Sequence, residues 1–197
     1  MIDNHTLLEN YLKQSKYIKA GNGIVIIPDI SGFTEFVSTI CLEAGRYITY
    51  ELLSTLIECN NLDMQISEIE GDAILFYKFG DPPLLSKILN QYEIMLKAFT
   101  KKLHQIEEIV GHKLGLSLKL IAHYGDFSEY NIGGFKKLYG QTIVQSHKLL
   151  KNLIKSNTYV LLTNEMRSAV KYNETIDSKH KYSMSYVNQV YSYYDYQ

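Results

Sequence analysis

The sequence is poor in several features that mark special classes of protein. Among its 197 residues are no tryptophan, three prolines and two cysteines. Cys41 and Cys59 lack the spacing of a metal-binding pair, so we interpret both as free thiols in a reducing compartment. No run of about 18 apolar residues is present, which argues against a membrane-spanning helix and against a membrane partner.

An excess of charge of either sign is missing as well. The chain carries 20 Lys and Arg against 21 Asp and Glu, a net charge of -1. Such a balance favours neither nucleic acid nor an acidic membrane as a partner. The first residues, Met1 to His5, lack the basic and then apolar order of a secretory signal, so we expect a cytoplasmic protein. A hydrophobic content of 46% in a chain of this length suits one domain with a substantial core.

Residues 24–34, IVIIPDISGFT, are the stretch around which the chain is organised. The β-branched run at 24–27 predicts a buried strand, and Pro28 marks its end or an edge. Asp29 follows, and the chain then turns into a helix for which Thr34 is the expected N-cap. A carboxylate at a strand end, followed by a turn and a helix start, suits a phosphate and its metal ion. The alternative is that Asp29 is only a turn residue.

A second acidic stretch supports the interpretation of Asp29 as a metal ligand. The pair Gly71-Asp72 lies between strand-like runs at 62–69 and 73–79, which predicts a tight hairpin. If this hairpin pairs beside the first strand, Asp72 lies at the same end of the sheet as Asp29. Two converging carboxylates form a divalent-metal site of the kind that phosphoryl chemistry uses. Alternatively, Asp72 is a plain hairpin aspartate.

The remaining pattern mixes helices and strands. We predict helices over residues 7–19, 35–42, 46–59 (after a break at Gly45), 85–110 and 140–154, and strands over 114–124, 158–162 and 182–194, with a second hairpin at 125–134. Hairpins alternating with helices predict an α+β fold, with helices mainly on one face of a mostly antiparallel sheet.

The two acidic motifs, DISGFT and EGDA, resemble the catalytic domain of class III nucleotidyl cyclases, the adenylyl and guanylyl cyclases. The phrases IPDISGFT, SEIEGDA and HKLLKN resemble more narrowly a bacterial cyclase-like family known mainly as a domain of unknown function. The resemblance implies a ferredoxin-like βαββαβ core. It divides the chain into an N-terminal helical segment (1–22), a cyclase-like domain (23–163) and a C-terminal helix and edge-strand extension of that domain (164–197).

The resemblance also implies a site. In the family, two aspartates bind two divalent ions, Mg²⁺ or Mn²⁺, which activate the ribose 3′ hydroxyl and hold the triphosphate. The matching metal ligands are Asp29, Asp72 and the backbone carbonyl of Ile30. The phosphate-binding positions are Gly32, Phe33 and Thr34.

Two further positions select the base in the family, and they match Glu68 and Lys137 here. Glu68 would accept hydrogen bonds from guanine and Lys137 would donate to its O6, a combination that favours GTP. The alternative is that the two side chains pair with each other and the base pocket is lost.

One motif departs from the family. Active cyclases carry an Asn that orients the ribose and an Arg that stabilises the transition state, and Val144 and Lys148 occupy these positions. Lysine keeps the charge without the planar fork, and loss of a transition-state donor costs about 10²–10³-fold in rate. His147 is a possible substitute.

Three hypotheses follow. The chain is a phosphorus-oxygen lyase with an altered site, in which Lys148 is catalytic and cyclisation is slow or absent. Alternatively, it is a catalytically dead binding or signalling module that acts through dimerisation or a partner, or it is a phosphohydrolase that uses the same two carboxylates. The family geometry implies a head-to-tail homodimer that sets Lys148 of one chain against Asp29 and Asp72 of the other.

Overall fold

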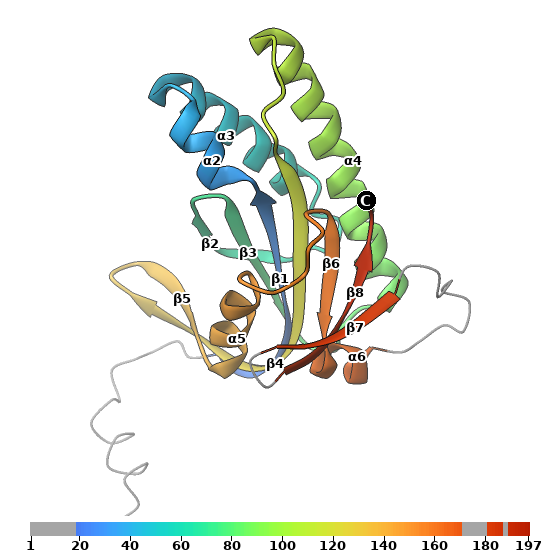
Figure 1. Ribbon diagram of the computed structural model, residues 1–197. Coiled ribbons are helices and arrows are strands. Elements are labelled where there is room, and N and C mark those ends of the chain that lie inside the picture. Colours follow the sequence, from blue (N-terminus) through green and yellow to red (C-terminus); the bar gives the residue numbers. More distant parts are fainter. Residues whose placement is uncertain (1–18, 171–180, 187–188) are drawn as a thin grey trace, which may run out of the picture.

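An eight-stranded mixed sheet organises the chain (Figure 1). The computed structural model describes residues 19–170, 181–186 and 189–197. The strands are β1 (Lys19–Ser31), β2 (Gln65–Glu70), β3 (Ala73–Phe79), β4 (Ser117–Ile132), β5 (Phe135–Tyr139), β6 (Tyr159–Thr163), β7 (Lys181–Tyr186) and β8 (Gln189–Asp195). The helices are α2 (Phe33–Thr39), α3 (Leu42–Glu58), α4 (Leu85–Val110), α5 (Gln141–Leu149) and α6 (Asn164–Ala169). None of these helices has the length and apolar character needed to cross a bilayer.

The strand order is β2-β3-β1-β4-β6-β8-β7, and β5 pairs with the C-terminal part of β4, residues 128–132. Every pairing is antiparallel except that of β4 with β6. This arrangement confirms the predicted α+β class and the βαββαβ core. The C-terminal region forms two strands where one was predicted, and β8 lies between β6 and the edge strand β7. The helix predicted over residues 7–19 lies outside the described residues, except that Lys19 belongs to β1.

The sheet separates two apolar layers. Ile24 and Ile26 of β1 face the layer that contains α2, α3, α4 and α6, while Val25 and Ile27 face the layer that contains α5. Burial on both faces explains why the strand is apolar at every position rather than at alternate ones. The helices therefore lie mainly on one face, as predicted, and of the described helices only α5 lies on the other (Figure 1). The side of the sheet that carries α5 also carries the site described below.

Two predictions about the first helices are wrong. Thr34 is not the N-cap of α2, because the helix begins at Phe33 and Gly32 caps it. Gly45 does not break a helix but lies buried inside α3, and a Cβ there would meet Ile40 Cγ2 at 2.9 Å. The glycine allows close packing against the α2–α3 connection. In the sequence pattern alone, such a glycine looks like a helix break.

The predicted bounds around α5 are also wrong. β4 continues through Gly125 to Ile132, so the hairpin turn lies at residues 133–134. α5 ends at Leu149 rather than at residue 154. Asn152 supplies the physical reason, because its Nδ2 donates to the Leu149 carbonyl (2.7 Å) and its Oδ1 accepts from the backbone N–H of Ile154 (2.9 Å). A side chain that satisfies backbone groups in this way competes with continuation of the helix.

Candidate functional site

Asp29 and Asp72 come from adjacent strands and meet at one end of the sheet. Asp29 lies near the end of β1 and pairs in register with Ala73, the first residue of β3. Asp72 precedes β3 in the hairpin turn, and its carbonyl accepts a hydrogen bond from the N–H of Ile30 (3.1 Å). The two aspartates thus have the placement that the sequence predicts.

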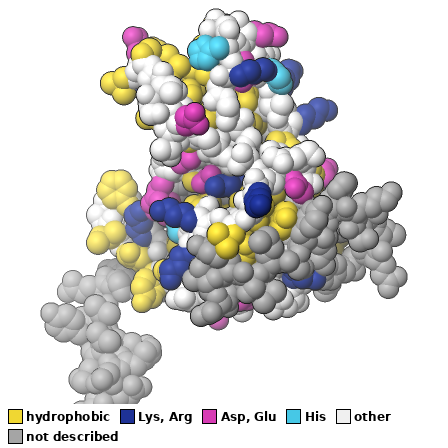
Figure 2. Space-filling view, in the orientation of Figure 1, with side chains coloured by type: hydrophobic (Ala, Val, Ile, Leu, Met, Phe, Trp, Pro, Cys, Tyr) yellow, Lys and Arg dark blue, Asp and Glu magenta, His cyan; other side chains and the backbone are white. Residues whose placement is uncertain are grey.

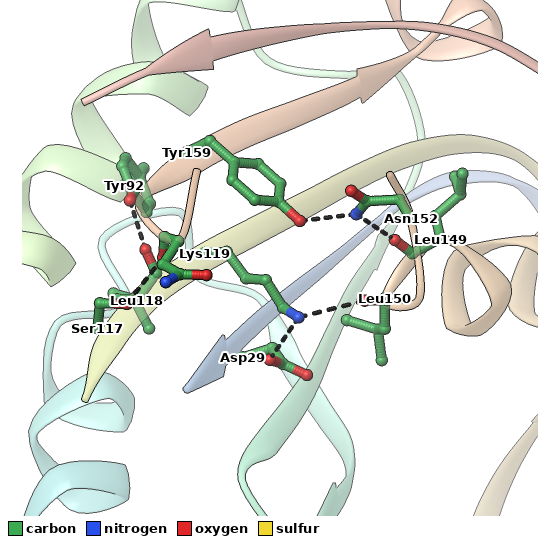
Figure 3. A network of polar contacts seen from close by, with 10 residues as sticks. Asp29, Tyr92, Ser117, Leu118, Lys119, Leu149, Leu150, Asn152 and Tyr159 are labelled. Atoms are coloured by element: carbon green, nitrogen blue, oxygen red, sulfur yellow. Dashed lines mark hydrogen bonds and ion pairs between the residues drawn. The ribbon is translucent and has the colours of Figure 1, made fainter. Parts of the chain in front are cut away.

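Lys119 is a site residue that sequence reasoning missed. It lies opposite Asp29 in the β1–β4 register, and its Nζ is 3.1 Å from Asp29 Oδ1. The same ammonium group donates to the carbonyl of Leu150 (3.2 Å), just after α5 (Figure 3). The sequence contained one signal, a charged residue within an alternating strand. The partner of that residue depends on strand register, which only the folded chain shows.

Burial shapes the electrostatics of the two carboxyl groups. The pKa of Asp29 is raised by burial, against which the ammonium of Lys119 acts. The pKa of Asp72 is also raised, first by burial and then by the negative charge of Asp29. Both shifts are caused first by burial, which disfavours the charged form of a carboxyl group, and the ammonium of Lys119 offsets this effect only in part. A cation at this place would lower their free energy.

A cavity of about 660 Å³ opens beside the two carboxylates. It is lined by the predicted phosphate-binding residues Gly32, Phe33 and Thr34 together with Ile30, and by His147 and Lys151 from the α5 side. The turn at Gly32 closely approaches the segment just before β4: the φ of Gly32 is +86°, and a Cβ there would meet the Gly115 carbonyl oxygen at 2.5 Å. Positive and negative side chains lie next to each other on this face of the molecule (Figure 2). The volume falls within the range of small-molecule sites.

The donor set fits Mg²⁺ or Mn²⁺ held jointly with a ligand. Within the described ranges, no three His, Cys, Asp or Glu side chains gather as a metal cage. Mg²⁺ needs no such cage, since it commonly takes one or two carboxylates, keeps waters and binds substrate phosphates. Asp29 and Asp72 supply two carboxylates of this kind, and the ammonium of Lys119 offsets the effect of their burial only in part. Lys119 occupies one oxygen of Asp29 and competes with a metal for it.

The residues expected to select a base lie together but are engaged. Lys137 Nζ in β5 is 2.9 Å from Glu68 Oε2 in β2, and His147 Nε2 is 3.4 Å from Glu68 Oε1. The hydrogen bond to Glu68 raises the pKa of Lys137, so the lysine stays charged. Both carboxylate oxygens of Glu68 therefore have partners within the chain. A base that binds here must displace one of them.

α5 presents two different sides. Val144 and Lys148, four residues apart, are both exposed, and neither lines the cavity. His147 and Lys151, also four residues apart, do line it. Val144 and Lys148 share one face of the helix because of this spacing, whereas Lys151 follows the end of α5 at Leu149. Within one chain, the two residues that depart from the cyclase motif, Val144 and Lys148, therefore do not share the cavity of Asp29 and Asp72.

Comparison with protein-family models gives one match, to the family described as "Protein of unknown function (DUF2652)", over residues 49–159. No curated protein matches the chain. Comparison with solved structures finds many similar folds. The guanylyl cyclase Cya2 has a TM-score of 0.72 at 14% identity, with 89% of this chain and 92% of that chain covered.

Two further structures come from Pseudomonas aeruginosa. The adenylyl cyclase CyaB has a TM-score of 0.72 at 18% identity, covering 92% of this chain and 96% of that one. A class III adenylyl cyclase-like ATP-binding protein has a TM-score of 0.65 at 13% identity, covering 78% of this chain and 36% of that one. At such identities the comparisons establish the class III cyclase fold, as the two acidic motifs predict.

Proposed function

The chain belongs to the family described as "Protein of unknown function (DUF2652)", and we propose that it binds a nucleoside triphosphate together with a divalent cation at Asp29 and Asp72. The observation that carries the proposal is the meeting of these two carboxylates beside a cavity that the Gly32–Thr34 turn lines. The negative charge of the two carboxylates, which Lys119 offsets only in part, favours the binding of a cation. A bound cation in turn favours the binding of a phosphate group.

The residues of the chain have separate tasks in this proposal. Asp29, Asp72 and the Ile30 carbonyl hold the ions, and the turn at Gly32, Phe33 and Thr34 approaches the phosphates. The chemistry that two such ions supply is neutralisation of phosphate charge and activation of the ribose 3′ hydroxyl. Lys119, which already touches Asp29, exchanges part of that contact for a phosphate oxygen when ligand arrives.

We expect cyclisation to be slow or absent. Binding a substrate and its transition state equally well does not accelerate the chemical step. The groups that would favour the transition state are replaced by Val144, which cannot hydrogen-bond, and by Lys148, which lacks the planar fork of arginine. Neither residue lines the cavity of its own chain, so Lys148 would act only on the site of a second copy.

Calorimetry tests the proposal. Each of the four nucleoside triphosphates is titrated into the protein with Mn²⁺, and we expect saturable heat that Asp72→Asn removes. Asp63→Asn is the matched control, since Asp63 lines a different cavity and asparagine tolerates its φ of +51°. Absence of heat with every nucleotide would refute the proposal that the protein binds a nucleoside triphosphate. Rapid formation of a cyclic nucleotide in the same mixtures would refute the expectation of slow cyclisation.

The contacts of Glu68 and Lys137 lead us to propose a preference for GTP over ATP. The Glu68 carboxylate accepts from guanine N1–H and the amine, and Lys137 donates to O6, after their mutual contact opens. We predict that the double variant Glu68→Lys with Lys137→Asp shifts the ratio of the two affinities toward ATP by about tenfold, on the scale of one or two charge-assisted hydrogen bonds. An unchanged ratio would mean that the pair does not face the base.

The same contacts favour a second candidate, a catalytically dead signalling module. Glu68, Lys137 and His147 satisfy one another without ligand, as they would in a domain that has lost its base pocket. Such a module acts through dimerisation or partner binding. The calorimetry distinguishes the two candidates, because only the first predicts heat with triphosphates.

A further inference from the structure

The C-terminal turn of α5 faces the cavity of its own chain. His147, Leu150 and Lys151 line the space that also contains Asp29 and Asp72. Val144 and Lys148 of the same helix do not line it. Within the described ranges, neither Lys148 nor Lys151 forms an ion pair. The two lysines therefore carry the same charge, but only Lys151 faces the cavity.

The backbone around Lys151 is held from both sides (Figure 3). Lys119 donates to the carbonyl of Leu150, the preceding residue (3.2 Å). Asn152, the following residue, donates to the hydroxyl of Tyr159 in β6 (2.6 Å). The N–H of Lys151 itself donates to the Lys148 carbonyl (3.2 Å). The sheet thus fixes the backbone point from which the exposed Lys151 side chain extends, so binding need not order this backbone again.

The helix dipole opposes an anion at this end of α5. The C-terminal end of a helix carries partial negative charge, which disfavours a nearby anion. The Leu150 carbonyl at this end is already covered by the Lys119 ammonium. His147 and Lys148 lie in the last turn as well. The basic groups at this end outweigh the partial charge of the carbonyls.

We propose that His147 and Lys151 bind the phosphate chain of a nucleotide in cis, so that each single chain holds a complete phosphate site. This inference rests on the proposed function and adds which residues recognise the ligand. The carboxylates of Asp29 and Asp72 offset part of the positive charge of the two divalent ions, so a bound triphosphate keeps uncompensated negative charge. Lys151 supplies a further positive charge from the α5 side of the cavity. His147 reaches the phosphates when it leaves Glu68. Lys148, by contrast, takes no part in ground-state binding within its own chain.

The test uses inorganic tripolyphosphate with Mn²⁺, a probe that carries no base. We expect Lys151→Ala to weaken its affinity about five- to thirtyfold, the range of one charge-assisted contact, and His147→Gln to weaken it less. Lys97→Ala is the matched control, because Lys97 is an exposed lysine of α4 that does not line the cavity, and we expect the affinity of this variant to stay within about twofold of the original. The stoichiometry should be one per chain and should not change with protein concentration. Thermal melting checks that each variant is folded.

The outcomes separate this inference from the proposed function. If the protein binds triphosphates but Lys151→Ala leaves the tripolyphosphate affinity equal to that of Lys97→Ala, the cis site is refuted and the proposed function stands. If Lys148→Ala weakens binding and Lys151→Ala does not, the site lies between two chains, which also refutes the inference. If neither nucleoside triphosphates nor tripolyphosphate bind, both proposals fall together.

Discussion

His123 is a buried polar residue whose neighbours determine its protonation. It is 1% exposed in β4, where Nδ1 lies 2.7 Å from Thr163 Oγ1 and Nε2 lies 3.0 Å from Gln145 Oε1. The Thr163 oxygen also accepts from the N–H of Met166 (3.1 Å). Its hydroxyl hydrogen is therefore available to Nδ1, which accepts it when Nε2 carries the ring proton. Neutral histidine satisfies this arrangement, and it links α5 to the sheet.

Burial lowers the pKa of His123, against opposing contributions from Glu165 and Gln145. The unfolded chain binds a proton here near pH 6.5, whereas the folded chain does so only at lower pH. Stability from this residue is therefore complete above about pH 6.5 and is lost as the pH falls below it, with a slope of at most about 1.4 kcal/mol per pH unit. We predict that His123→Gln removes this part of the slope in denaturant unfolding between pH 7 and pH 5. The exposed His112→Gln is the control and should leave the slope unchanged.

At the scale of elements, the β1–α2 turn holds the site together. The carbonyl of Gly32 accepts from the N–H of Phe36 (3.1 Å), which starts α2, while Gly32 itself approaches the start of β4. Gly111, the C-cap of α4, has nearly the same φ, +79° against +86°. A Cβ at Gly111, however, would have open space around it, with no contact within 4 Å from the described part of the chain beyond its immediate neighbours. An alanine at either position would therefore have the same unfavourable backbone conformation. Only at Gly32 would its Cβ also meet neighbouring atoms.

We predict that Gly32→Ala destabilises the protein more than Gly111→Ala does. The conformation alone costs about 1 kcal/mol or more in each variant, and the 2.5 Å approach to Gly115 adds a steric cost only at Gly32. Urea unfolding of both variants measures the difference. Because the turn lines the cavity, Gly32→Ala should also weaken triphosphate binding. Equal loss of stability in the two variants would show that the close approach relaxes without cost.

At the scale of the whole molecule, the β4–β5 hairpin exposes unusual apolar surface. Ile132, Phe135 and Tyr139 are 62%, 72% and 74% exposed, and Figure 2 shows apolar side chains gathered beside basic ones over this hairpin. Large apolar side chains gathered on a surface mark interaction sites more often than single exposed ones do. Val144 on α5 is exposed as well. We propose that a second copy of the chain covers this surface, which is the arrangement that would bring Lys148 to the other site.

We therefore predict a homodimer in sedimentation equilibrium at micromolar concentration. Phe135→Glu should weaken the dimer at least about tenfold, because it sets a charge within an apolar contact. Ile109→Glu is the control: Ile109 is 85% exposed but lies near the end of α4, away from the hairpin. A wild-type monomer well above micromolar concentration would contradict the prediction. Binding of tripolyphosphate by the Phe135→Glu monomer would at the same time support the cis phosphate site.

Much of the fold follows from local pattern. The period-3.6 apolar face of α4 and the strand of residues 73–79 were predictable with their bounds nearly correct, because each depends on neighbours within a few positions. The hairpin turn with Asp72 was predictable for the same reason. The expectation that Pro28 marks the end of its strand or an edge was wrong, because β1 continues past Asp29 to Ser31 and lies between β3 and β4. Gly45 was misread, since a glycine looks alike in sequence whether it ends a helix or allows close packing inside one.

The amino-acid sequence by itself determined the α+β class, the hairpin, the two carboxylates and the resemblance to class III cyclases, all of which are carried by short motifs and periodicity. Tertiary structure alone decided that Lys119 meets Asp29, that Lys137 and His147 meet Glu68, and that Lys151 rather than Lys148 faces the chain's own cavity. These contacts join residues far apart in the chain. They depend on strand register and on the angle at which α5 lies over the sheet, and neither quantity has a local signature in the sequence.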